Sequence, residues 1–165
     1  MSLPAPITIS QEAKLIKEAL EEYVTSMGGV VEIVSSEKMF YRPDATDSQT
    51  ARVLICYGGE TARGSFSQKG WWHRVDRNWK IAVTRGRGFF QVRGESLYEH
   101  DVQETPLYDV VENIRDIFRL QQNISEETPG CDYAGITPMS FGNLVIDGFI
   151  ISGSTANDIP SNLTH

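Results

Sequence analysis

Residues 77–85 read Arg-Asn-Trp-Lys-Ile-Ala-Val-Thr-Arg, and this stretch decides the fold class. Its large apolar side chains alternate with polar ones, which is the pattern of a β-strand with one face in a core and the other in water. The core face carries Trp79, Ile81 and Val83, and the wet face carries Asn78, Lys80 and Thr84. The chain is therefore built around a sheet that is covered on one side.

Other strands are predicted on both sides of this stretch. Residues 52–57 form a nearly continuous apolar run, which indicates a central strand covered on both faces and ended by Gly58-Gly59. Val30 to Val34 predicts an earlier strand, and residues 133–141 and 144–151, with a Gly142-Asn143 turn between them, predict two later ones. We expect residues 60–72 to be a long loop tipped by exposed aromatic side chains.

Two segments have helical periodicity. Residues 10–27 place apolar side chains at helical spacing, follow a possible capping box at Thr8 to Gln11 and end at Gly28-Gly29. A second helix opens at Thr105-Pro106. The opposite face of the first helix is expected to be solvated and mostly acidic. That face comprises Glu12, Lys14, Lys17, Glu18, Glu21 and Glu22.

The predicted order is α-β-β-β-α-β-β, which favours an α+β fold with two helices packed on one face of a mainly antiparallel sheet. A length of 165 residues suits one domain with a real core and is short for two. We expect this single α+β domain to span residues 1–153. The polar residues 154–165 are predicted to be a flexible C-terminal tail.

The composition excludes several classes of protein. No stretch approaches the roughly 20 apolar residues of a membrane helix, and the N-terminus lacks the regions of an export signal. Cys56 and Cys131 are 75 residues apart with no histidine at metal spacing, so a buried thiol and an incidental one are favoured over a disulfide. The three histidines are scattered, and no zinc site can be drawn from them.

The charges of the chain are divided unequally along its length. Residues 63–93 hold eight of the 15 basic residues, all three tryptophans and one acidic residue, Asp76. The formal charge of this basic window is +7, which leaves −14 for the rest of a chain whose net charge is −7. Such polarity can serve a polyanion, or it can let copies of one molecule meet head to tail.

Candidate sites for chemistry are weak. Residues 84–88, Thr-Arg-Gly-Arg-Gly, could cradle a phosphate, but residues 89–92 after them look extended, so a basic turn at a strand end is favoured. The acidic residues of 95–104 share no face and indicate a solvated loop. Ser65 and Ser67 lack the nucleophile-elbow turn that presents a catalytic serine, and no histidine is placed to act as their base. We expect no catalytic residue, no metal ligand and no cofactor.

The adjacent tryptophans of residues 71–74, Trp-Trp-His-Arg, cannot both point into one core if the backbone is extended, so at least one should lie near the surface. Exposed aromatics beside arginine suit base stacking or a protein interface. We favour the protein interface, because the chain is acidic with a pI near 4.9 and lacks the strand motifs of the OB-fold and the RRM. The alternative that the tryptophans fold over the sheet while the arginines snorkel stays open. The predicted interface residues are Trp71, Trp72, Arg74, Arg85, Arg87 and Arg93.

These features in this order resemble the tail terminator, or tail completion, proteins of tailed bacteriophages and Mu-like prophages. The resemblance is one of order and spacing and covers most of residues 10–151. It is carried by the first helix, the strand Val-Leu-Ile-Cys-Tyr-Gly-Gly of 53–59, the strand Trp-Lys-Ile-Ala-Val of 79–83, the helix Pro-Leu-Tyr-Asp-Val-Val-Glu-Asn-Ile-Arg of 106–115 and the final β segment.

The resemblance implies a structural protein without catalytic residues. Copies would form a six-fold ring on the end of the tail tube, stop its polymerisation and offer a surface to the head connector. The expected partners are the chain itself, as a homohexamer, and the tube and connector proteins, with no membrane. The expected location is the bacterial host cytoplasm during assembly and then the virion tail. The alternative is a nucleic-acid binding module that uses the basic window.

Overall fold

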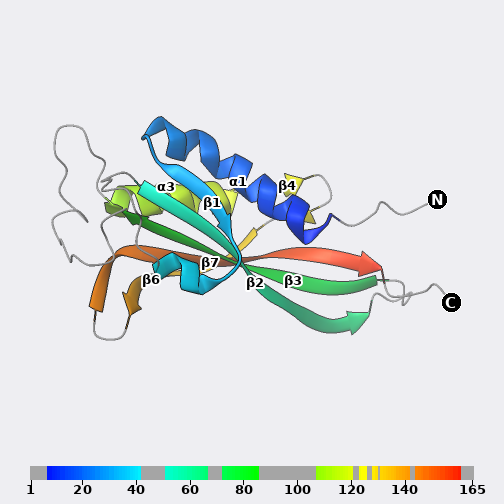
Figure 1. The fold of residues 1–165 in the computed structure, drawn as a ribbon. Coiled ribbons are helices and arrows are strands. Elements are labelled where there is room, and N and C mark those ends of the chain that lie inside the picture. The colour runs from blue at the N-terminus through cyan, green and yellow to red at the C-terminus, as the bar shows by residue number, and fades with distance from the viewer. Residues whose placement is uncertain are drawn as a thin grey trace.

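The computed structural model describes residues 7–41, 51–66, 72–85, 107–120, 123–125, 128–129, 131–141 and 144–160. Within these ranges, helices α1 (Ile9–Ser26) and α3 (Leu107–Leu120) lie on the same face of a five-stranded sheet (Figure 1). The sheet strands are β1 (Val30–Val34), β2 (Ala51–Phe66), β3 (Trp72–Arg85), β6 (Cys131–Phe141) and β7 (Leu144–Pro160). The predicted α+β class and the order of its main elements are confirmed.

The sheet has the strand order β1-β2-β3-β7-β6. Only β1 and β2 run parallel, and the other neighbours are antiparallel, as expected for a mainly antiparallel sheet. A separate two-stranded sheet of β4 (Asn123–Ser125) and β5 (Thr128–Pro129) was not predicted from the sequence. The capping box at the start of α1 is present, with Thr8 and Gln11 each bonding the backbone of the other.

The main core lies between the helices and the sheet. Trp79, Ile81 and Val83 of β3 point into it, as their alternation predicted. Helix α3 packs closely on the sheet at Gly153, where a side-chain Cβ would lie under 3.0 Å from Cε1 of Phe118. Real Cβ contacts are longer than this, so the absent side chain at Gly153 lets the Phe118 ring pack directly on β7.

A smaller core lies on the opposite face of the sheet. The short 3₁₀ helix η1 (Glu37–Tyr41) places Phe40 over this face, so that β2 is buried on both sides as predicted. The members of this cluster are Phe40, Leu54, Cys56, Ala82 and Met139. The prediction of a wet face on β3 is wrong at its end, where Thr84 is buried. The buried thiol expected at Cys56 is confirmed, and burial raises its pKa.

Strands β2, β3 and β7 continue beyond the part of the sheet that β1 and β6 flank. The end of the sheet that these three strands form alone is called the extension. We predicted that β2 ends at Gly58-Gly59, but it continues to Phe66 through a register shift between Tyr57 and Glu60. Gly59 has a φ of +90°, a conformation open to glycine that lets the strand pass through this irregularity instead of stopping. The predicted loop is therefore strand over residues 60–66, and residues 67–71 lie outside the described ranges.

The expectation of a flexible tail from Ser154 is also wrong for residues 154–160. These residues form the end of β7 and pair with β3 in unbroken register as far as Pro160. The sequence did not predict a buried strand here, because Thr155 and Asn157 are polar although both are buried. Residues 161–165 are not among those that the structure describes.

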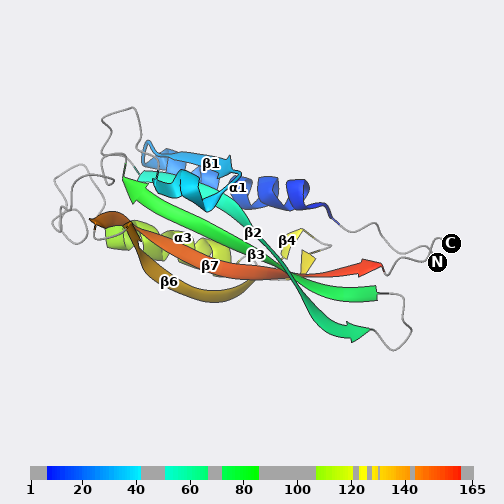
Figure 2. The ribbon, with the colours of Figure 1, turned by 60° about the horizontal axis from the view of Figure 1, so that its bottom comes forward.

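The extension is twisted strongly against the rest of the sheet. Figure 2 shows β2, β3 and β7 crossing at a narrow waist, after which their order is reversed: β2 is near the upper margin before the waist and at the lower margin beyond it. β1 pairs with β2 only from Arg52 to Cys56, so the far half of β2 is an outer strand of the extension. The outer edge of β1 and the outer edge of this far half consequently face opposite sides of the molecule.

Candidate functional site

The six predicted interface residues fall at the margins of the described chain. Trp71, Arg87 and Arg93 lie outside it, and for Trp72, Arg74 and Arg85 it gives the backbone alone. These three belong to β3, in register with Pro160, Asp158 and Ala51. Trp72 and Arg74 therefore lie on the extension and Arg85 lies at the opposite end of β3. The glycines of the 84–88 turn and the acidic segment 95–104 also lie outside the described residues.

Two basic residues of the window have described side chains, and both are used inside the fold. The Nη1 atom of Arg77 lies 2.7 Å from Oε2 of Glu12, and both side chains are buried. The Nζ atom of Lys80 lies 2.6 Å from Oε1 of Glu37, and this pair is partly exposed. Arg77 is thus a buried structural charge, whereas Lys80 forms an ion pair at the surface.

Glu12 does not lie on the solvated face of its helix. We expected it on the solvated face of α1, but it is completely buried under the first turn of the helix. Its carboxylate accepts hydrogen bonds from four side chains of β3 and β7. The donors are Arg77 Nη1 at 2.7 Å, Trp79 Nε1 at 3.0 Å, Asn157 Nδ2 at 3.4 Å and Thr155 Oγ1.

This Glu12 cluster (Glu12, Arg77, Trp79, Thr155 and Asn157) is closed to solvent. A carboxylate surrounded by donors and shielded from water cannot meet a substrate, so the arrangement suits anchoring and not catalysis. Glu12 lies four residues before Ile16 and eight before Leu20, and both of these are buried. This helical spacing was a signal in the sequence that Glu12 belongs to the apolar stripe. Its partners on β7 could not be found, because that segment was interpreted as a tail.

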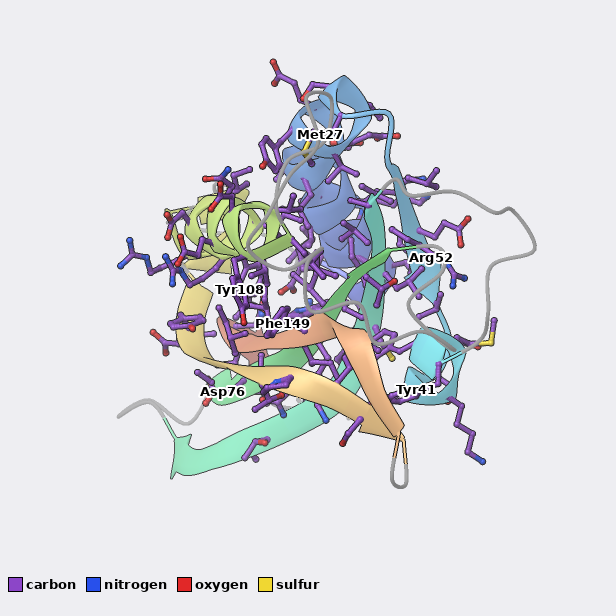
Figure 3. All side chains as sticks on the ribbon, turned by 90° about the vertical axis from the view of Figure 1, so that its left-hand side faces the viewer. Met27, Tyr41, Arg52, Asp76, Tyr108 and Phe149 are labelled. Carbon is purple, nitrogen blue, oxygen red and sulfur yellow. The ribbon has the colours of Figure 1, made fainter. Side chains whose placement is uncertain are left out.

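Exposed apolar side chains are concentrated on β1. Val30 is 49% exposed and Ile33 is 44% exposed, on a strand of five residues at the edge of the sheet. Two tyrosines are also exposed, Tyr108 at 42% and Tyr133 at 37%. Tyr108 is supported from one side, because its ring packs against Phe149 with centroids 5.6 Å apart (Figure 3). Among the residues that the structure describes, the large exposed aliphatic side chains therefore lie on β1.

The two edge strands of the sheet differ in how they are protected. β6 contains Pro138 and two register shifts against β7, features that discourage another strand from adding to an edge. β1 has neither: its five residues, Val-Val-Glu-Ile-Val, pair with β2 in continuous register. Glu32, at the centre of β1, is its one charged residue and is exposed.

The described part of the chain holds no cluster of three or more histidine, cysteine or acidic side chains arranged for a metal ion. None of the helices described there is long and apolar enough to cross a membrane. A scan against models of known protein families gives no match, and a search of curated proteins finds none that is similar.

Proposed function

We propose that this protein is a structural component of a bacteriophage or prophage tail. Copies associate into a six-fold ring that caps the tail tube, ends its polymerisation and binds the head connector. The proposal combines the resemblance to tail terminator proteins with the α+β fold and the element order, and it requires no catalytic group.

The observation that carries the proposal is the opposition of charge within one chain. The ion pairs Glu12–Arg77 and Glu37–Lys80 each remove one positive charge from the basic window and one negative charge from the rest. The window keeps a formal charge of +5 and the remainder −12 after this correction. The opposition therefore survives the two ion pairs that the described residues form between the window and the rest of the chain.

A closed ring gives this opposition a physical use. Neighbours in a ring meet through two different surfaces, one on each copy, and these surfaces must be complementary. A chain with separate basic and acidic regions can supply both sides of such a contact. Binding to nucleic acid would use the basic window alone and leave the acidic excess without a role.

Electron microscopy of the purified protein mixed with tail tubes tests the proposal. The tubes would be polymerised from purified tube protein of the same genome. We expect rings in the protein alone at high concentration and a ring on one end of each tube, with tubes that stop growing. Tubes of unchanged length with bare ends would overturn the proposal.

Charge reversal in the window gives a second test. We expect Arg85→Glu with Arg87→Glu to weaken self-association in sedimentation experiments more than it lowers the melting temperature. The matched control is Lys14→Glu with Lys17→Glu, which makes the same change of charge on α1. Unchanged sedimentation of the first variant, or salt-sensitive DNA binding by the wild type at micromolar concentration, would count against the proposal.

A further inference from the structure

The two faces of the sheet are covered very differently. Helices α1 and α3, of 18 and 14 residues, cover one face, and the five-residue η1 lies on the other. Figure 2 shows η1 in front of the strands and the two helices behind them. Within the described residues, η1 supplies the cover of the smaller core, because its other members belong to strands of the sheet.

η1 has one buried anchor, the ring of Phe40, which is 3% exposed. Its start is stabilised by Ser36, which accepts hydrogen bonds from the amides of Lys38 at 3.2 Å and Met39 at 3.0 Å. These bonds are local, so they shape the turn without fastening it to the sheet. A short 3₁₀ helix also has poorer hydrogen-bond geometry than an α-helix.

The ion pair between Glu37 and Lys80 is a second fastening of η1 to the sheet. Its oxygen and nitrogen lie 2.6 Å apart, but the two side chains are 44% and 38% exposed. Water and salt therefore screen the attraction. A segment held by one buried ring and one screened ion pair belongs to the parts of a fold that open most easily.

Cys56 lies beneath this segment and is 2% exposed. It pairs with Lys80 across β2 and β3, so the two side chains are neighbours on the face that η1 covers. Burial and the Glu37 carboxylate raise the pKa of the thiol, whereas the Lys80 ammonium lowers it. Lifting η1 would take Glu37 away and admit water, while Lys80 would stay on the sheet. The thiol should therefore react in the open form and not in the closed one.

We propose that η1 is a releasable strap, which lifts from the sheet while the rest of the fold stays intact and uncovers Cys56 and the apolar face around it. Ionic strength sets how often the strap lifts, because it acts on the exposed ion pair. This inference is independent of the proposed function, since it needs neither self-association nor a tail tube.

Alkylation of Cys56 by N-ethylmaleimide, followed by mass spectrometry of the intact protein, tests the strap. The measurements use a Cys131→Ser background, in which Cys56 is the one remaining thiol. The thiolate adds to the double bond of the maleimide and the ring then takes up a proton, so no oxidant is involved. The rate of alkylation reports how often Cys56 is uncovered.

Phe40→Leu should speed alkylation roughly fivefold, because it weakens the anchor by a substitution that cores usually tolerate. The matched control is Phe118→Leu, which makes the same change in the main core on the other face. It should lower the melting temperature at least as much and leave the rate of alkylation near that of the wild type. Equal acceleration in both variants would mean that Cys56 is reached by unfolding of the whole domain, and would overturn the proposal.

Salt gives a second readout that acts on the ion pair. Raising NaCl from about 0.1 M to about 1 M shortens the screening length from about 10 Å to about 3 Å, so alkylation of the wild type should rise roughly two- to fivefold. Glu37→Gln should react faster at low salt and lose this response. The control Asp116→Asn, which removes a carboxylate of similar exposure paired on α3, should keep it. A wild type without a salt response, or a response that persists in Glu37→Gln, would contradict the strap.

Discussion

The helix-facing side of the sheet is held in two different ways at its two ends. Beneath α3 and the last turns of α1 it is purely apolar, with Ile55, Ile81 and Ile151 fully buried. Beneath the first turn of α1 the same strands bury Arg77 and Thr155 against the Glu12 carboxylate. An apolar core tolerates small losses of contact, whereas a buried charge depends on all of its partners. Substitutions in the Glu12 cluster should therefore lower the free energy of unfolding more than substitutions in the apolar part of the core.

Arg77→Met should cause the largest loss of stability. It removes the charged partner of Glu12 while both side chains are buried. We expect the free energy of unfolding to fall by about 3 to 5 kcal/mol, since an unpaired carboxylate would remain in the core. Chemical denaturation measures this loss.

The double variant Glu12→Leu with Arg77→Met is the control for that prediction. It removes both charges together, so it should be clearly more stable than Arg77→Met alone. A double variant that is less stable than the single one would mean that the hydrogen bonds Glu12 accepts from Trp79, Thr155 and Asn157 outweigh the cost of its unpaired charge.

Gly153→Ala tests the apolar end of the comparison. The new methyl group would meet the Phe118 ring, so we expect a loss of about 1 to 3 kcal/mol from overpacking. The neighbouring change Ser154→Ala is the control and should be nearly neutral. Thermal unfolding followed by circular dichroism separates the two, and equal melting temperatures would contradict the close approach of α3 to β7.

Lys80→Met should have the smallest effect. Its ion pair with Glu37 is more than one third exposed on both sides, so water screens it, and a change below about 1 kcal/mol is expected. A loss as large as that of Arg77→Met would show that η1 depends on this pair and not on Phe40. Denaturation of the two variants under the same conditions gives the comparison.

The helices and strands outside the extension were predictable because their residues follow the periods of helices and strands. β1 was predicted with its observed bounds, and the capping box of α1 was predicted from Thr8 and Gln11. The alternation in β3 correctly assigned Trp79, Ile81 and Val83 to the core. In these segments hydrophobic burial and local propensity agree.

The extension was not predictable by the same reasoning. Its strands are rich in glycine and polar residues, and their stability comes from partners far away in the sequence. Thr155 and Asn157 look like tail residues until Glu12 is placed beside them, and Gly58-Gly59 looks like a strand end until the register shift is seen. Tertiary contacts therefore decided what local pattern could not.

The candidate interface was likewise only partly predictable from the sequence. The sequence identified the basic window and its opposed charge, but it could not separate Arg77 and Lys80, which are paired inside the fold, from the other basic residues. The open edge of β1 depends on strand order, which periodicity does not contain. Val30 and Ile33 look like ordinary strand residues in the sequence.

Native mass spectrometry of the wild type and of Arg85→Glu with Arg87→Glu tests head-to-tail self-association most directly. At a concentration where the wild type forms assemblies, this variant should be monomeric, and the control Lys14→Glu with Lys17→Glu should still associate. A variant at Arg85 and Arg87 that forms the wild-type assemblies would contradict the account.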